Sequence, residues 1–323
     1  MRPALALSIA FVALLAACGG GGDKQSPGEH AAAICAATPD ANNASVASAD
    51  ITEASGLAAS RRHDDFLLVH NDSGDSARVF AIDRMGNHHA TYALPGADAI
   101  DWEDMAIGPG PDSDLDYLYL ADIGDNAMQR AEIAVYRVPD PEVSISDTPT
   151  NNTFRSVETL VLRYPDRPHD AETLLVDPDS GDLVIVTKEL ATGTSLVFRA
   201  PASVTPDTPY TLEQAGQIDF KSFASTVTPP PGAPALVAGV PFLPTGGDVA
   251  PGGDLIAIRT YGTVWVWSRD KDTSLSDAFA AAPCEAPSAI EPQGEAIAFD
   301  RDGRGYTTVS EGANPPLHHF SAK

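Results

Sequence analysis

Asp101-Trp102-Glu103-Asp104-Met105-Ala106 opens a unit whose plan recurs along the chain. A turn follows this motif, then the alternating run Tyr117–Asn126 and a further short strand, Ala134–Val138. Four other segments repeat this order, with motifs that begin at Glu53, His169, Thr245 and Gln293. Recurring hairpin units of about 40–50 residues are typical of propeller blades. The sequence therefore predicts an all-β protein with the β-propeller fold.

The five motifs predict five blades. Six blades are the alternative, because the segment 201–243 is long enough to contain a degenerate hairpin. The N-terminal stretch Ala44–Ile51 is expected to complete the last blade and to close the ring. A pair of β-sandwiches is the competing architecture, and the internal repeat argues against it.

The N-terminus has the composition of a bacterial lipoprotein signal. Arg2 precedes the apolar run Ala4–Ala17, which is shorter than the ~20 residues of a membrane span. The run ends at Leu15-Ala16-Ala17-Cys18, which resembles the lipobox whose cysteine is acylated. We therefore expect a signal peptide over 1–17, a lipidated Cys18 with a flexible tether over 18–43, and the propeller over 44–323. By resemblance to Gram-negative lipoproteins, Gly19 favours an extracytoplasmic protein anchored in the outer membrane.

The charge of the chain limits its partners. Acidic residues outnumber basic ones by 45 to 20, for a net charge of −25. Such a chain repels nucleic acid and anionic lipid surfaces. We therefore expect no nucleic acid ligand, contact with the membrane through the lipid anchor only, and a monomer.

Two cysteines besides Cys18 bear on the fold. Cys35 and Cys284 lie near opposite ends of the chain. In an oxidising compartment a disulfide between them is favoured over two free thiols, because the two ends of a propeller chain meet.

The repeated motif places carboxylates where inner strands begin. Glu103, Glu172 and Glu295 occupy matching positions, and Asp101 stands two residues before the first of them. Inner strands line the channel of a propeller, so these carboxylates are expected to converge and to bind a cation such as calcium. The alternative is that each one caps a turn within its own blade. The other two units match less well, and offer Asp248, Glu53 or Ser55.

A second repeated element is Asp-x-Gly-Asp. It occurs at Asp72–Asp75 and at Asp122–Asp125. Asp72 and Asp122 are therefore further candidate calcium ligands, and a role in the turn alone is the alternative.

Basic residues stand at the comparable ends of later strands. Lys188 and Arg259 either neutralise the carboxylates or hold an anionic substrate. His169 and Glu172 are candidate general bases in a catalytic site. The sequence contains no Gly-x-Ser-x-Gly elbow, P-loop or zinc-binding spacing.

The motifs at 101–106, 121–126 and 293–298 resemble those of a largely uncharacterised family of secreted bacterial β-propeller lipoproteins. At the level of the fold, the chain is also similar to calcium-dependent propeller phytases and lactonases. These resemblances imply a propeller with a polar central site. Two functions agree with this expectation. One is binding of an envelope protein, a glycan or a small anionic ligand at the central face, and the other is calcium-dependent hydrolysis of a phosphoester or lactone.

Overall fold

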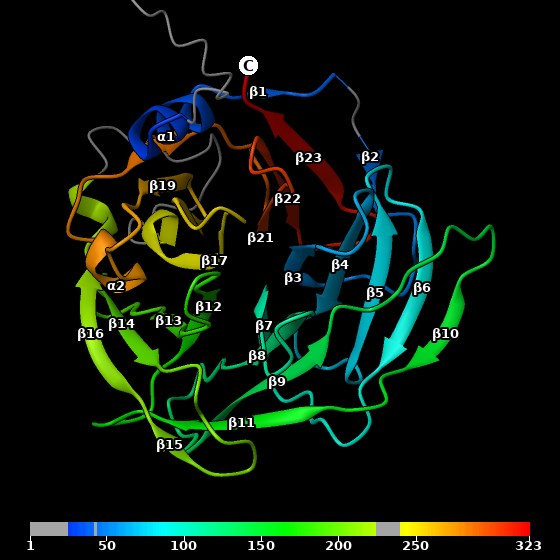
Figure 1. Cartoon of the computed structure of the whole chain (residues 1–323), viewed down its shortest axis with the longest axis horizontal. Coiled ribbons are helices and arrows are strands. Elements are labelled where there is room, and N and C mark those ends of the chain that lie inside the picture. The colour runs from blue at the N-terminus through cyan, green and yellow to red at the C-terminus, as the bar shows by residue number, and fades with distance from the viewer. Residues whose placement is uncertain (1–24, 42–43, 224–239) are drawn as a thin grey trace, which may run out of the picture.

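The computed structural model describes residues 25–41, 44–223 and 240–323, which form a ring of five β-sheets (Figure 1). Each sheet is a blade whose first strand lies nearest the central axis and whose later strands step outward. The chain is therefore a five-bladed β-propeller, as the sequence predicts. The expected signal peptide and Cys18 lie outside the described residues.

Blades 1 and 2 each contain five strands. Blade 1 contains β3 (Ala54–Ala59), β4 (Phe66–Asn71), β5 (Arg78–Asp83), β6 (His88–Ala93) and β10 (Thr150–Thr153). Blade 2 contains β7 (Trp102–Pro109), β8 (Asp116–Asp122), β9 (Ile133–Pro139), β11 (Glu158–Arg163) and β15 (Tyr210–Thr211). The outermost strands, β10 and β15, pair in parallel with β6 and β11. Each comes from a later part of the chain, so it links its blade to the next one.

The other blades follow the same plan. Blade 3 contains β12 (Ala171–Val176), β13 (Leu183–Thr187), β14 (Ser195–Ala200) and β16 (Glu213–Ile218). Blade 4 contains β17 (Pro244–Val249), β18 (Leu255–Thr260), β19 (Val264–Ser268) and β20 (Cys284–Ala286). Blade 5 contains β21 (Gly294–Phe299), β22 (Gly305–Ser310), β23 (Pro316–Ser321), β1 (Thr38–Pro39) and β2 (Ala44–Ser45). The described part of 201–243 adds short helices η1 (Phe220–Ser222) and η3 (Val240–Phe242) and no sixth blade.

The N-terminal strands close the ring, as expected. In β1, Thr38 pairs with Ser321 at the end of β23, and in β2, Ala44 pairs with Leu317 near its beginning. Both pairings are antiparallel, so residues from the two ends of the chain share one blade. Closure begins at Thr38, earlier than the stretch that we expected to complete the blade.

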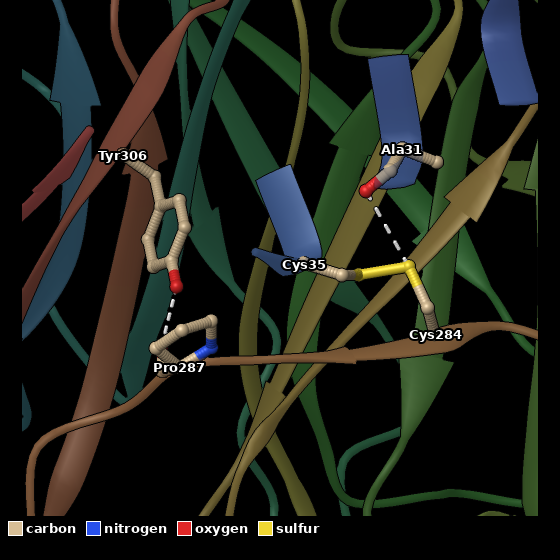
Figure 2. Close-up of a disulfide and its surroundings, with 5 residues drawn as sticks. All are labelled: Ala31, Cys35, Cys284, Pro287 and Tyr306. Carbon is tan, nitrogen blue, oxygen red and sulfur yellow. Dashed lines mark hydrogen bonds between the residues drawn. A yellow bond between two sulfur atoms is a disulfide. The ribbon is translucent and has the colours of Figure 1, made fainter. Parts of the chain in front are cut away.

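Helix α1 (Pro27–Cys35) precedes these strands and packs on the ring. Its N-terminus has a capping box in which Glu29 accepts the Ser26 N–H at 2.9 Å. Ile34 is fully buried in the cluster between blades 4 and 5. Cys35 forms the predicted disulfide with Cys284 of β20 (Figure 2). Residues 27–39, which we expected to belong to a flexible tether, are therefore folded onto the propeller because apolar packing and the disulfide hold them.

The core is divided among the spaces between blades. Five clusters of buried side chains occupy the five interfaces between neighbouring blades. Trp102 lies between blades 1 and 2, and Trp267 lies between blades 3 and 4. Burial of a large apolar side chain contributes roughly 1.5–3 kcal/mol. Because both faces of each blade are covered, the inner strands are buried along their whole length, except for Pro109 at the end of β7.

Helices are minor elements of the described chain. Besides α1, one short helix, α2 (Leu275–Ala278), packs beside Trp267 through Phe279, which follows it. None of the described helices is both long enough and apolar enough to cross a membrane.

Candidate functional site

All five inner strands carry a β-bulge at the same place, where the strand begins. The pairing register with the second strand shifts by one residue in β3, β7, β12, β17 and β21. The residues inserted there are Ser55, Glu103, Glu172, Thr245 and Glu295. A bulge bends a strand and redirects its side chain, and bulges are frequent beside functional sites. The motif carboxylates therefore occupy equivalent positions at one end of the channel, which we call the mouth.

The two less regular units differ from the expected match. Blade 4 places Thr245 at the bulge, where it donates to the carbonyl oxygens of Gly294 and Glu295 at 2.9 and 3.0 Å. Asp248 lies further along β17 and accepts the Phe299 N–H at 2.7 Å, so it joins blades 4 and 5. In blade 1, Ser55 takes the bulge position, and Glu53 is exposed outside the strand.

Three carboxylates from blades 1 and 2 meet at the mouth. One oxygen each from Asp72, Asp101 and Glu103 lies within 4.8 Å of the others, and we call these residues the carboxylate cluster. Asp72 follows β4, whereas Asp101 and Glu103 flank the start of β7. All three belong to the predicted set of calcium ligands. The remaining members of that set lie elsewhere around the mouth.

Gly124 allows these carboxylates to approach the backbone. A β-carbon at this position would overlap both Oε1 of Glu103 and Oδ2 of Asp101. The second Asp-x-Gly-Asp motif therefore supplies space for the cluster through its glycine. Its first residue, Asp122, accepts the Asp101 N–H at 3.0 Å and an Arg130 guanidinium N–H at 2.8 Å. Asp122 thus positions the loop and lies outside the cluster.

Glu103 is the least solvated member of the cluster. Its side chain is buried, with 5% of the residue exposed, and its carboxylate accepts no hydrogen bond from the described residues. Burial, together with Glu172, Asp72 and Asp101, raises the pKa of Glu103 well above its ordinary value. Burial and the nearby Asp72 and Asp170 raise the pKa of Asp101 to about 6. The cluster therefore favours a bound proton or a bound cation over free negative charge.

A second group lies across the mouth on blades 3 to 5. Lys188 forms an ion pair with Glu172 and donates to the Tyr261 hydroxyl at 3.1 Å. We call Glu172, Lys188, Tyr261 and Glu295 the lysine network. Burial raises the pKa of Glu295 to about 7, with Lys188 opposing the shift and Glu311 adding to it. One lysine thus faces several carboxylates, so the mouth as a whole is acidic.

Asp104 lies in the channel below the mouth. This fully buried residue follows Glu103 in β7, and its carboxylate accepts N–H groups of Met105, Leu174 and Gly247 at 2.8 to 3.0 Å. These donors belong to blades 2, 3 and 4, and blades 2 and 4 are not neighbours. A side chain that joins them must cross the channel. Asp104 therefore spans the channel below the carboxylates, and we call the part of the mouth above it the cup.

Two residues nominated for catalysis are occupied elsewhere. His169 lies between Glu189, at 2.6 Å from Nδ1, and Asp166, at 3.1 Å from Nε2, and it is 1% exposed. Arg259 forms an ion pair with Glu291 and donates to the carbonyl oxygens of Ala296 and Val309. Their polar atoms hold loops and blades together. The geometry therefore does not support His169 as a general base or Arg259 as a clamp for an anion.

Tyr261 and Asp104 are the residues of the site that the sequence did not single out. Tyr261 directly follows the second strand of blade 4, at the position that Lys188 takes in blade 3. Aligning the second strands of the repeated units would have identified Tyr261 from the sequence. For Asp104, the sequence contains no signal that separates it from the neighbouring motif acids.

Comparisons with known proteins give little further information. No family model matches the chain, and no curated protein matches its sequence. Among solved structures, hydrazine synthase from Kuenenia stuttgartiensis aligns with 83% of this chain and 96% of that chain, at 13% sequence identity and a TM-score of 0.41. The propeller assignment rests on the strand order and ring closure of the chain itself.

Proposed function

We propose that the protein is a lipid-anchored, extracytoplasmic propeller that binds calcium at the carboxylate cluster and uses this cup to bind an envelope partner or an anionic ligand. The observation that carries the proposal is the state of Glu103. Only 5% of the residue is exposed, no described residue donates a hydrogen bond to its carboxylate, and two more carboxylates lie beside it. A buried charge of this kind requires neutralisation.

The donor set favours calcium among the common cations. Asp72, Asp101 and Glu103 offer only carboxylate oxygens, which are hard ligands suited to calcium. Zinc and copper sites usually include His or Cys, and none belongs to the cluster. The three acids come from a loop and a strand end, so they can adjust to the irregular geometry that calcium accepts. Water and a bound ligand would complete the coordination.

A cation at this place would also explain how an acidic protein binds an anion. The mouth alone repels negative charge, because Glu172, Glu295 and Glu311 surround Lys188. A bound divalent cation would reverse the local potential on the side of blades 1 and 2. A carboxylate or phosphate of a glycan, protein or small molecule would then contact the cation, with Lys188 opposite.

The compartment is inferred from two features. The disulfide between Cys35 and Cys284 is typical of proteins that fold outside the cytoplasm. Leu15-Ala16-Ala17-Cys18 resembles a lipobox, so Cys18 would carry the acyl chains. Together they favour a lipid-anchored protein outside the cytoplasm, and Gly19 after the cysteine favours the outer membrane if the source is Gram-negative.

Calcium titration of residues 19–323 tests the proposal. We expect one calcium per chain with a Kd of roughly 10⁻⁴ M, as in extracellular modules. Glu103→Gln and Asp101→Asn are each expected to weaken binding about tenfold or more, because each removes a charged ligand. Isothermal titration calorimetry measures both quantities.

The control is Asp147→Asn, which removes an exposed acid outside the mouth. It should bind calcium as the unchanged protein does. Equal affinity in all four proteins would mean that any bound calcium lies elsewhere and that the carboxylate cluster is not the calcium site.

Calcium-dependent hydrolysis is the second candidate, and the lysine network favours it. Glu172 is buried beside Lys188, and Lys188 contacts Tyr261, so groups able to exchange protons face the cluster. A bound calcium would polarise a phosphoester or lactone oxygen. Hydrolysis of a phosphoester or lactone panel that needs calcium and is lost in Glu172→Gln, with calcium affinity retained, would support this candidate. Absence of turnover across the panel would leave binding as the function.

A further inference from the structure

The propeller has two faces that differ in which chain segments they present. Inner strands begin on the cup face, where the carboxylate cluster lies. They end on the opposite face, where turns lead into the second strands, and we call this the turn face. Asp254 and Gly303 belong to such turns, in blades 4 and 5.

Helix α1 is fixed at the turn face. The His30 side chain lies 2.8 Å from Oδ2 of Asp254 and 2.8 Å from the carbonyl oxygen of Gly303. Both contacts are with turns, and the imidazole joins blades 4 and 5 there. The first turn of α1 is therefore attached to the face opposite the cup.

The strands after α1 show the same direction of travel. Thr38 pairs with Ser321, the last residue of β23, and Ala44 pairs with Leu317 near its start. β23 runs from the cup face to the turn face. Because β1 and β2 pair with it in the antiparallel direction, they run along the outside of blade 5 from the turn face to the cup face. The described chain therefore begins beside the turn face.

Strong contacts prevent α1 from moving along the side of the ring. Ala31 and Ile34 are buried against blades 4 and 5, and Cys35 is covalently joined to Cys284 (Figure 2). The link from Cys18 to Ser26 covers eight residue steps, which extend at most about 29 Å. An inner strand of six residues alone is about 20 Å long. A relaxed Gly-rich link of this length spans only about 15 Å, so the turn face is expected to lie nearer the bilayer than the cup face.

We propose that the lipid anchor holds the turn face toward the membrane, so that the carboxylate cup opens away from the bilayer. This inference rests on the proposed anchor at Cys18. Its consequence is a choice of ligand source: the cup meets a protein, glycan or solute of the surrounding compartment, and headgroups of its own membrane lie behind the domain.

Energy transfer between the protein and a labelled bilayer tests this orientation. Met85 is 56% exposed in the turn between β5 and β6, on the turn face, and Leu190 is 66% exposed in the loop after β13, on the cup face. Full-length lipidated Met85→Cys and Leu190→Cys proteins would each carry one donor dye. They would be reconstituted in neutral phosphatidylcholine vesicles that contain an acceptor-labelled lipid.

We expect transfer from position 85 to be about twofold or more efficient than from position 190, because the faces stand about 20 Å apart. Leu115→Cys on the turn face and Ile290→Cys on the cup face give a second pair with the same expected order. Equal transfer from both faces, or stronger transfer from the cup face, would overturn the orientation while leaving the anchor in place.

The anchor itself is controlled by Cys18→Ser, which cannot be acylated. Vesicle binding by the lipidated protein and its absence in Cys18→Ser would support the anchor. Equal behaviour of the two proteins would overturn both the anchor and the orientation. Calcium binding by residues 19–323 is independent of this result, so failure of the metal site and failure of the orientation can be told apart.

Discussion

The ion pairs of the turn face and the carboxylate cluster of the cup face use charged residues in different ways. On the turn face, charges are paired between blades: Arg269 of blade 4 contacts Asp177 and Asp179 of blade 3 at 2.9 and 2.7 Å. At the cup, Glu103 and Asp101 approach each other, and no basic side chain of the described residues forms an ion pair with either of them. The fold can supply partners for buried charge at the cup as well, since Arg130 pairs with Asp122 and Lys188 pairs with Glu172. Unpaired carboxylates at one place therefore indicate a role that costs stability.

The largest expected effect comes from removing the ion pairs between blades 3 and 4 on the turn face. Arg269→Met should lower the free energy of unfolding by about 3–5 kcal/mol, because it removes one partner of a buried ion pair and leaves acids behind. Urea denaturation measures this change. Calcium affinity should stay unchanged, since Arg269 lies on the opposite face. A loss of calcium binding in the folded variant would contradict the separation of the two faces.

The disulfide lies at the side of the ring and provides a test that involves neither the turn-face ion pairs nor the carboxylate cluster. Cys35→Ala combined with Cys284→Ala should cost about 2–4 kcal/mol, because the closed loop spans most of the chain. The loss should be accompanied by proteolytic sensitivity before Thr38, where α1 would loosen. Limited proteolysis followed by mass spectrometry identifies the cleavage site. Cleavage first within the blades would mean that α1 is held by its apolar contacts alone.

Stability of the metal-free protein should fall as the pH rises from about 4 to about 7. Burial raises the pKa of Asp248 from 3.8 to about 6 and the pKa of Glu295 from 4.5 to about 7. A carboxyl with a raised pKa in the folded state contributes stability that is present below the unfolded pKa and lost above the folded pKa. We expect a loss of at most about 3 kcal/mol from each group in chelator. Stability that rises over this range would show that the buried acids are neutralised by other means.

The smallest effect comes from the cup itself. Glu103→Gln should raise the stability of the metal-free protein at pH 8 by about 1 kcal/mol, because it removes a buried negative charge beside two others. Added calcium should then stabilise the variant less than the unchanged protein. Thermal unfolding with calcium and with chelator measures both. Glu172→Gln serves as the contrast, because it frees the partnered Lys188 and should destabilise.

The repeat made the architecture predictable, because each blade is a local unit whose motif, turns and strands recur. Closure by residues near Ala44 and the pairing of Cys35 with Cys284 follow from a ring in which chain ends meet. The sequence also contained a signal for α1 that we did not use. Ser26-Pro27-Gly28-Glu29 is a capping box with Pro at the first helical position, and it marks a helix inside the expected tether.

The site was less predictable, because partners decide what each charged residue does. Glu103 and Arg259 are both charged residues at strand ends, yet Arg259 meets Glu291 from a loop outside the repeat. His169 likewise meets Glu189. Matching by residue type chose Asp248 for blade 4, whereas the bulge register places Thr245 there. Pairing across blades is a tertiary property that spacing within one blade does not contain.

The most direct test is a crystal structure grown with calcium, with anomalous scattering measured at long wavelength. The account predicts one anomalous peak within about 2.3–2.6 Å of oxygens from Asp72, Asp101 and Glu103. It also predicts no peak at that place in Glu103→Gln crystals grown in the same solution. Crystals with millimolar calcium and no density among these carboxylates, or with a calcium only at another place, would contradict it.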